Sequence, residues 1–429
     1  MENCIKIAIA GNVDSGKSSL IGVLSNKKLD DGRGSARNTI LRNKHEKLTG
    51  RTSCISFNNV IYEFENIKKV ITLVDLAGHE KYLKTTVFGL TGLFVDYAIV
   101  VIGANMGITK MTKEHLGILL YLKIPIIVLI TKVDICPDNV YEKTRNILKK
   151  ILKVPLFNKK PYFLSLDEKE ALQDMDKYLN LIDQNNSLIP VLSISNKTGQ
   201  NINCLNKLIS SLKPRKQWDE KKVNGSILYI DSTFMVHGIG LVISGTLKGD
   251  SIHINQKLWI GPINNKFIPV KARSLHNNIR ENVNVIYNSE VGCIAIRFFG
   301  KDIVTREQIK KGVMLFSDDK FKKNVSNEFK AKITILHHST TICNNYQPII
   351  HCGPIRQTAK LTILELSDSK NSSYNIENTS VNKICLRTGS TAIVQFTFMF
   401  HPEYIEIGSS LFFRDGNTKG YGEILEVIK

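Results

Sequence analysis

The chain has 429 residues, of which 42% are hydrophobic and 23% charged. This composition excludes a wholly disordered chain, and the length predicts about two to four domains. Its 58 Lys and Arg residues against 39 Asp and Glu give a net charge of +19, which favours polyanionic partners, nucleic acid first.

The first 212 residues alternate short apolar runs with helical patterns, beginning at a strand predicted over Ile5–Ala10. Further strands are predicted over Val70–Asp75, Tyr97–Gly103, Pro125–Thr131 and Ile189–Ser195. Helices are predicted over Ser18–Leu24, Lys113–Leu122, Val140–Leu152 and Ile202–Leu212, and over Glu168–Leu179 in a polar insertion at Lys153–Ser187. This alternation predicts an α/β domain, with a mostly parallel sheet and helices on both of its faces.

The second half of the chain has the pattern of β structure. Short β-branched runs separated by turn residues are Ser226–Ile230, Gly240–Leu247, Lys257–Ile260, Val291–Phe298, Lys330–Leu336, Ala359–Leu366, Thr391–Phe398 and Gly420–Val427. Their spacing favours antiparallel β-barrels, and a polar break near Phe316–Asn327 divides them into two groups. We therefore expect the α/β domain at 1–215, a linker at 216–222, and β-barrel domains at 223–323 and 324–429.

The cysteine residues and the apolar segments indicate the environment in which the protein functions. The eight Cys residues form no Cys-x-x-Cys pair, so no spacing supports a zinc or redox site. Nothing resembles a secretory signal, and the most apolar stretch is interrupted by Lys123 and Pro125, so we expect a reducing, cytoplasmic setting and no membrane insertion.

The positive charge is not spread evenly along the chain. Residues 1–220 carry 32 basic and 22 acidic side chains, whereas residues 325–429 carry 10 and 9, which places the basic surface in the first two thirds. A base-composition bias that favours Lys, Asn and Ile is an alternative explanation.

A phosphate-binding loop follows the first predicted strand. The pattern Gly-x4-Gly-Lys-Ser is met by Gly11, Asn12, Val13, Asp14, Ser15, Gly16, Lys17 and Ser18, and Ser19 continues it into the helix. Glycines allow backbone N–H groups to converge on phosphate oxygens at a helix N-terminus. Lys17 would reach the β- and γ-phosphates and Ser18 would ligate Mg²⁺. The alternative for this motif alone is a chance Gly-rich turn.

Three further motifs stand in order at predicted strand ends. Asp75 and Gly78 could hold a metal ion through water and contact a γ-phosphate. In Thr131-Lys132-Val133-Asp134, the Asp134 carboxylate would accept the two N–H donors that guanine presents and adenine lacks. Ser195, Asn196 and Lys197 could contact the base. Because ligands bind at the carboxyl ends of strands in α/β sheets, the four motifs together predict a GTP-binding domain.

The motifs and the β-rich remainder resemble the translational GTPases of the elongation factor Tu class, and most closely the eukaryotic GTP-binding protein 1 and 2 type. Segments that carry the resemblance are Asp31–Arg37, Lys44–Glu46, Gly50–Ser53, Val242–Leu247, Gly261–Pro262, Ile350–Ala359 and His401–Tyr404. It covers essentially the whole chain, and implies a P-loop GTPase domain followed by two antiparallel β-barrels.

The resemblance also implies roles for single residues. Thr52 matches the first-switch threonine that completes Mg²⁺ coordination with Ser18, and Asp75 completes the metal set. His79 matches the histidine that orients the attacking water, and Lys17 neutralises phosphate charge. Two departures affect these roles: Thr131 replaces the usual Asn of the base motif, and Arg51 stands where an apolar residue helps gate the histidine.

The function implied is a GTPase that hydrolyses GTP to GDP and phosphate and switches its affinity for a tRNA-like ligand at the ribosome. Lys27–Arg51 holds eight basic against three acidic residues, which fits contact with RNA phosphates or a solvated mobile loop. The alternatives are an mRNA surveillance or ribosome-rescue GTPase carrying a release-factor-like protein, and a GTP-dependent scaffold for RNA-decay proteins. We expect a monomer with GTP or GDP and Mg²⁺ as its cofactors.

Overall fold

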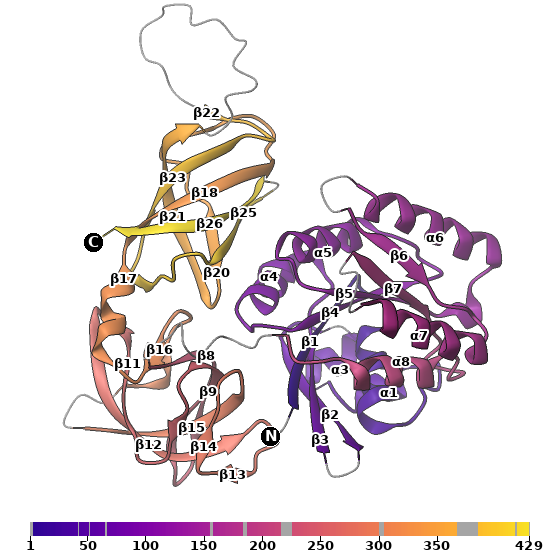
Figure 1. Cartoon of the computed structure of the whole chain (residues 1–429), viewed down its shortest axis with the longest axis horizontal. Coiled ribbons are helices and arrows are strands. Elements are labelled where there is room, and N and C mark those ends of the chain that lie inside the picture. The colour runs from indigo at the N-terminus through magenta and orange to yellow at the C-terminus, as the bar shows by residue number, and fades with distance from the viewer. Residues whose placement is uncertain are drawn as a thin grey trace, which may run out of the picture. The chain divides into compact units, whose positions relative to one another are not determined.

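The computed structural model describes residues 3–41, 43–50, 52–64, 67–154, 158–182, 187–215, 225–299, 304–366, 385–416 and 418–428. Two compact units are present, one formed by residues 1–90 and 94–216 and the other by residues 91–93 and 217–429 (Figure 1). The linker predicted at 216–222 lies outside the described residues.

The first unit is built on a seven-stranded sheet in the order β2-β3-β1-β4-β5-β7-β6. Its strands are β1 (Asn3–Gly11), β2 (Ser56–Phe64), β3 (Ile67–Asp75), β4 (Tyr97–Gly103), β5 (Ile126–Thr131), β6 (Lys160–Phe163) and β7 (Leu188–Ser193). Only the β2–β3 pairing is antiparallel, so the predicted mostly parallel sheet is confirmed. Every residue of β4 and β5 is buried, as expected for central strands covered on both faces.

Helices cover the two faces of this sheet (Figure 1). They are α1 (Lys17–Asn26), α2 (Ser35–Asn38), α3 (Lys44–Thr49), α4 (Leu83–Thr91), α5 (Lys110–Tyr121), α6 (Asp138–Leu152), α7 (Glu168–Ile182) and α8 (Ile202–Ser211). Apolar residues of α1, α7 and α8 pack with the strands in one buried core, whereas α4, α5 and α6 lie on the other side of the sheet (Figure 1). None of the helices in the described part of the chain is long and apolar enough to cross a membrane.

The parallel register brings the ends of the central strands to one edge. Ile9 is level with Asp75, Gly11 with Val101, and Gly103 with Thr131. The motifs that follow β1, β3, β5 and β7 therefore converge on this edge, where ligands bind in open α/β sheets.

The second unit contains two closed barrels of six strands each. The first is formed by β8 (Ser226–Val236), β9 (Gly240–Gly249), β15 (Val291–Phe298), β12 (Lys266–Asn277), β11 (Lys257–Ile263) and β16 (Met314–Phe316). The second is formed by β18 (Glu328–His337), β23 (Thr391–Phe398), β21 (Ile355–Leu366), β20 (Ile349–Cys352), β25 (Ser410–Asp415) and β26 (Thr418–Ile428). Alternate side chains of strands such as β23 point into an apolar core, so the predicted barrel architecture is confirmed.

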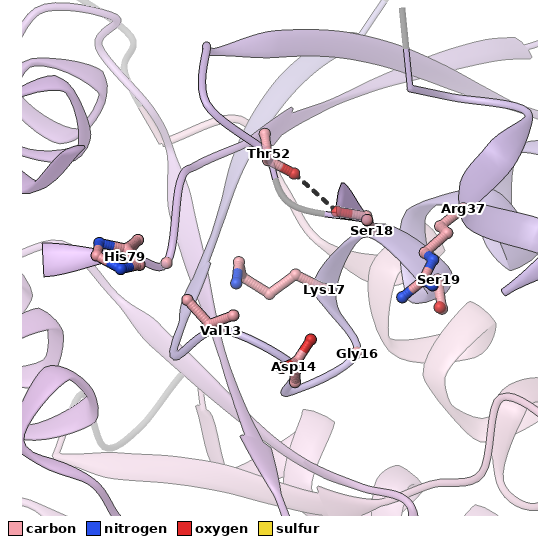
Figure 2. A pocket seen from close by; sticks show the side chains of 11 residues that line it. Val13, Asp14, Gly16, Lys17, Ser18, Ser19, Arg37, Thr52 and His79 are labelled. Carbon is pink, nitrogen blue, oxygen red and sulfur yellow. Dashed lines mark hydrogen bonds between the residues drawn. The ribbon is translucent and has the colours of Figure 1, made fainter. Parts of the chain in front are cut away.

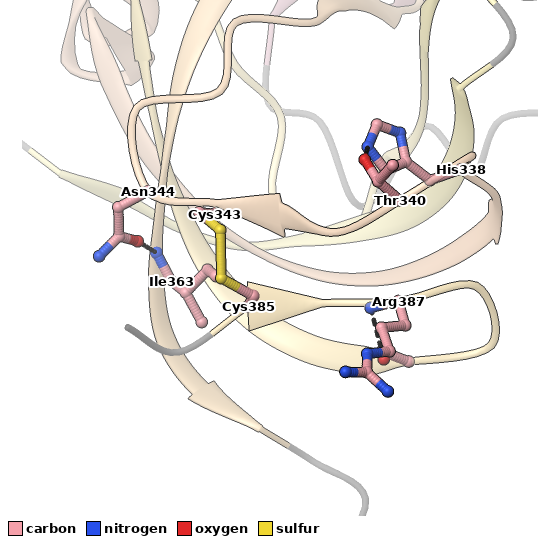
Figure 3. Close-up of a disulfide and its surroundings, with 8 residues drawn as sticks. His338, Thr340, Cys343, Asn344, Ile363, Cys385 and Arg387 are labelled. Atoms are coloured by element: carbon pink, nitrogen blue, oxygen red, sulfur yellow. Dashed lines mark hydrogen bonds between the residues drawn. A yellow bond between two sulfur atoms is a disulfide. The ribbon is translucent and has the colours of Figure 1, made fainter. Parts of the chain in front are cut away.

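A disulfide joins Cys343 to Cys385 on the short paired strands β19 (Ile342–Cys343) and β22 (Cys385–Leu386) (Figure 3). The two residues are direct cross-strand partners with Cα atoms 4.5 Å apart. No Cys-x-x-Cys spacing marks these two residues, and their disulfide departs from the reducing setting expected from the sequence. Their sequence separation of 42 gives no spacing signal, because the barrel alone brings them together.

Candidate nucleotide-binding site

The phosphate loop is a tight turn between β1 and α1 that only small residues allow. Gly11 has φ of +151°, and a Cβ there would lie 2.3 Å from the Val101 carbonyl oxygen. Gly16 has φ of +87° and directly precedes α1, whose N-terminal amides point into the loop. The loop is closed by the Ser15 hydroxyl, which donates to the Asn12 carbonyl at 2.9 Å. This backbone arrangement can cradle phosphate oxygens.

A pocket opens directly above this loop (Figure 2). It is lined by Val13, Asp14, Gly16, Lys17, Ser18, Ser19, Arg37, Gly50, Thr52, Gly78 and His79. The loop, the first switch and the residues after β3 thus meet at one place. The structure brings together the predicted phosphate, metal and water-positioning residues.

Lys17 carries the positive charge of the pocket floor. Its side chain is almost fully buried, and Nζ donates to the Asn12 carbonyl at 2.7 Å. Burial lowers the pKa of Lys17, while the nearby carboxylates of Asp75 and Asp14 oppose that shift. A buried ammonium that lacks a full set of hydrogen-bond acceptors is stabilised when phosphate oxygens supply them.

Three side-chain oxygens beside Lys17 fit a magnesium ion. Asp75 Oδ2 accepts from Ser18 Oγ at 2.9 Å and from Thr52 Oγ1 at 3.0 Å, and the two hydroxyls lie 2.9 Å apart (Figure 2). The other oxygen of Asp75 is buried with no hydrogen-bond partner among the described residues. Burial raises the pKa of Asp75, against the opposing effects of Lys17 and the two hydroxyls. A hard cation ligated by hydroxyl oxygens near a buried carboxylate would satisfy this cluster.

Gly78 and His79 form the opposite wall. A Cβ on Gly78 would lie 2.6 Å from Lys17 Nζ and 2.7 Å from the Gly11 carbonyl oxygen, so only glycine fits against the loop. His79 is exposed, and its Nδ1 accepts from the backbone N–H of Lys81 at 3.1 Å. In Figure 2 the His79 ring lies beyond Val13 and is directed away from Lys17. In this conformation the ring does not point into the pocket.

The predicted base-binding residues lie at the neighbouring strand ends. Ser195 Oγ donates to Asp134 Oδ1 at 2.7 Å, which orients an exposed carboxylate. Asn196 Nδ2 lies 3.5 Å from the Gly16 carbonyl oxygen, and the Lys197 side chain packs against Gly32. Lys132 has φ of +61° at the end of β5. These contacts connect the base motifs to the phosphate loop and to the first switch.

Thr131 lies beneath the phosphate loop. It has no exposed surface, and Oγ1 donates to the Ser15 carbonyl at 2.6 Å. The Thr131 hydroxyl therefore holds the phosphate loop. Residues further along the motif are the ones placed to face a base.

Sequence and structure comparisons agree with this geometry. The model of the elongation factor Tu GTP-binding domain family matches residues 2–215. GTP-binding protein 1 of Xenopus laevis is 38% identical, with 99% of this chain and 64% of that protein aligned. GTP-binding protein 2 of Mus musculus is 32% identical, with 99% of this chain and 69% of that protein aligned. The chain belongs to the elongation factor Tu family of GTPases, together with GTP-binding proteins 1 and 2. It spans about two thirds of the length of these two relatives.

A solved structure shows the same fold as this GTPase-family chain. The crystal structure of translation elongation factor SelB from Methanococcus maripaludis, in complex with the GTP analogue GppNHp, superposes with a TM-score of 0.69. The match covers 100% of this chain and 80% of that chain at 22% identity. It supports the predicted fold class, a P-loop GTPase domain followed by two β-barrels.

Part of the first switch of this GTPase is held by a hydrogen-bond network around Glu46. Glu46 of α3 is 4% exposed and accepts from the backbone N–H and the hydroxyl of Ser53, at 2.8 and 2.9 Å. Burial alone would raise the pKa of Glu46, but these bonds and one from Asn43 hold it below its ordinary value. The network fixes the backbone next to Thr52. Arg51, which we expected at the histidine gate, lies outside the described residues.

Sequence reasoning missed two residues of the pocket, Arg37 and Gly50. Both lie in segments that carry the family resemblance, and Gly50 directly precedes Arg51 and Thr52. In the sequence, Arg37 is one of many basic residues of the first switch, and no motif spacing distinguishes it from the others. Its position becomes visible only when α2 is packed against α1.

Proposed function

We propose that this chain is a translation-factor-like GTPase that hydrolyses GTP to GDP and phosphate and thereby switches its affinity for a tRNA-like ligand at the ribosome. The observation that carries the proposal is the contact of first-switch Thr52 with Ser18 and Asp75. A nucleotide and its metal ion bound beside Thr52 would therefore change the conformation of the first switch. Such a role belongs in the cytoplasm.

Charge neutralisation and positioning are the chemistry that this chain offers. Lys17 and the loop amides would bind the β- and γ-phosphates, and Ser18 and Thr52 would hold Mg²⁺ near Asp75. The bound Mg²⁺ would neutralise charge that develops on the phosphate oxygens. In the described conformation Nδ1 of His79 accepts from the Lys81 N–H, so the neutral ring carries its proton on Nε2. After turning inward, the ring would orient water through a hydrogen bond.

Hydrolysis by the chain alone should be slow. The His79 ring points away from Lys17, so the water-positioning contact is not formed in this conformation (Figure 2). A small GTPase without its activator turns over at about 10⁻³ per second or slower. We propose that the ribosome supplies the missing step by turning His79 inward.

The basic first switch is the proposed RNA-contacting surface. Lys44 and Lys47 are exposed on α3, close in sequence to Thr52. Contacts from such residues to a phosphate backbone do not depend on base sequence and weaken steeply with salt. RNA binding would then respond to the nucleotide through the segment that carries the metal threonine.

One experiment tests the RNA ligand. The full chain, loaded with a non-hydrolysable GTP analogue or with GDP, is incubated with a ribosome-depleted cell extract, and the bound RNA and protein are identified. Enrichment of tRNA in the GTP-analogue state alone is the expected result. Recovery of a release-factor-like protein, of RNA-decay proteins, or of the same RNA in both states would contradict the proposal.

A His79→Ala variant tests the catalytic assignment. We expect nearly unchanged GTP and GDP affinity, because the His79 ring is directed away from Lys17, and loss of ribosome-stimulated hydrolysis. Lys81→Ala is the matched control, because Lys81 contacts Nδ1 of His79 through its backbone N–H, which the substitution keeps. Stimulated turnover that survives in His79→Ala would show that His79 does not orient the water.

A further inference from the structure

Arg37 stands on a part of the first switch that is anchored in the core of the GTPase domain. Its neighbour Ala36 packs so closely on α1 that a Cβ added at Gly22 would lie 2.2 Å from the Ala36 carbonyl oxygen. Ile40 also belongs to the buried core. The Asp30 carboxylate accepts from the Ala36 N–H at 2.9 Å, which fixes the start of α2. The backbone of Arg37 is therefore positioned without help from a nucleotide.

The Arg37 guanidinium reaches the phosphate pocket from this anchored position. Two left-handed glycines flank it: a Cβ on Gly34 (φ +97°) would lie 2.5 Å from Nε, and a Cβ on Gly50 (φ +65°) would lie 2.9 Å from Cζ. The guanidinium therefore lies close to the backbone of both glycines. Nε is buried and has no hydrogen-bond partner among the described residues. A buried donor of this kind is costly unless a ligand completes it.

In Figure 2, Arg37 and Ser19 lie on one side of the pocket that both line, and His79 lies across it beyond Lys17 and Val13. With the role proposed for His79, water would attack the γ-phosphate from the side of the pocket where His79 lies. Arg37 is thus on the side of the leaving group, where the α- and β-phosphates continue toward the ribose.

We propose that Arg37 is a phosphate ligand supplied by this chain itself, which binds the α- and β-phosphate oxygens of the nucleoside triphosphate and stabilises the leaving diphosphate during hydrolysis. In that step the water oxygen forms a bond to the γ-phosphorus, and the bond from γ-phosphorus to the β–γ bridging oxygen breaks. Its electron pair stays on the diphosphate, and the water proton leaves with the inorganic phosphate. The guanidinium neutralises charge on the leaving oxygen and exchanges no atom.

A purely structural role is the competing interpretation, because the guanidinium also contacts Gly50 near Thr52. Such a clamp would stabilise the folded switch whether or not nucleotide is present. A phosphate ligand instead affects the rate of bond cleavage at saturating nucleotide, and a guanidinium in solution can partly replace it. The proposal rests on GTP hydrolysis by this chain but not on any ribosomal or RNA partner.

The test is single-turnover hydrolysis of γ-labelled GTP by the full chain at saturating protein and Mg²⁺, without ribosomes. Arg37→Ala should lower the rate constant about 10- to 100-fold, the effect of one charge-assisted interaction, and millimolar guanidinium should restore part of it. Arg37→Lys should be intermediate, because a point charge keeps attraction but loses the planar fork. Arg33→Ala is the matched control, since Arg33 is an exposed residue of the same segment.

The outcomes separate this proposal from the proposed function. An unaltered rate constant in Arg37→Ala, with hydrolysis by the wild type, would overturn the role of Arg37 alone. Absence of hydrolysis by the wild type both in this assay and after ribosomes are added would overturn the proposed function itself. A lower rate with reduced melting temperature of the nucleotide-free protein and no response to guanidinium would favour the clamp and overturn the phosphate role. If Arg37→Ala does not fold, the same measurements on Arg37→Lys decide.

Discussion

Replacing Thr131 with valine removes one hydroxyl from beneath the phosphate loop and leaves a side chain of nearly the same shape. Thr131 Oγ1 donates to the Ser15 carbonyl at 2.6 Å and lies 3.3 Å from the carbonyl of Ile102. The side chain has no exposed surface, so water cannot replace the lost donor. The substitution thus leaves the Ser15 carbonyl without this partner in the centre of the nucleotide site.

The expected cost follows from that burial. A buried acceptor that loses its partner costs about 1 to 3 kcal/mol. Because the loop binds the phosphates that GTP and GDP share, both affinities should fall together. Affinity falls by the part of this cost that the nucleotide-free loop can relieve by rearranging; if that part is 1 to 2 kcal/mol, each affinity falls about 5- to 30-fold.

The assay is equilibrium binding of fluorescent GTP and GDP analogues, together with thermal unfolding of the nucleotide-free protein. Thr144→Val is the matched control, since Thr144 is 2% exposed and its hydroxyl donates to the Val140 carbonyl within α6. It should lose stability and keep nucleotide affinity. If Thr131→Val binds both nucleotides normally, or changes only the preference for guanine over adenine, the hydroxyl does not act through the phosphate loop.

Three further expectations follow from other parts of the chain. Asp134→Asn should lose preference for GTP and gain binding of xanthosine triphosphate, because the amide offers a donor where guanine requires an acceptor; retained selectivity for GTP would contradict the base-reading role. Burial raises the pKa of Glu403 to about 8, against a hydrogen bond from Gln357 that lowers it, and the ordinary value is 4.5. The folded state then binds more protons than the unfolded state between these two values, so the free energy of unfolding should fall as pH rises across that window and should vary less in Glu403→Gln, as measured by denaturant titration. Reductant should lower the melting temperature of the wild type, because the disulfide closes a long loop whose constraint contributes about 2 to 4 kcal/mol, and Cys343→Ser should show no such response.

The sequence predicted most of what is needed for nucleotide binding, because that chemistry depends on contiguous motifs. Gly11 to Ser18, Asp75 and Asp134 each stand at a strand end, and a parallel sheet brings such ends together. Strands were missed where local pattern is weak. The edge strand β6 has only four residues and includes Pro161, and β12 is interrupted by Pro269.

What the sequence could not predict depends on packing between distant segments. The spacing of Cys343 and Cys385 indicates no bond, and only the closed barrel places β19 beside β22. The same holds for Arg37, whose guanidinium enters the pocket because Ala36 packs against Gly22 of α1. The replacement of Asn by Thr131 suggested a weaker contact with the base, whereas the hydroxyl serves the phosphate loop.

Because α2 is anchored in the core, a nucleotide can act on only part of the first switch. Ala36 and Ile40 belong to the buried core, so α2 is anchored by contacts that do not involve a nucleotide. Thr52, in contrast, is held through Ser18 and Asp75, at the point where a metal ion and the γ-phosphate would bind. Glu46 joins α3 to Ser53, so α3 should follow Thr52 when that contact changes. Under the proposed function, nucleotide control of RNA binding would act through the basic residues of α3, whereas the basic residues before Ile40 other than Arg37 would contribute equally in both states.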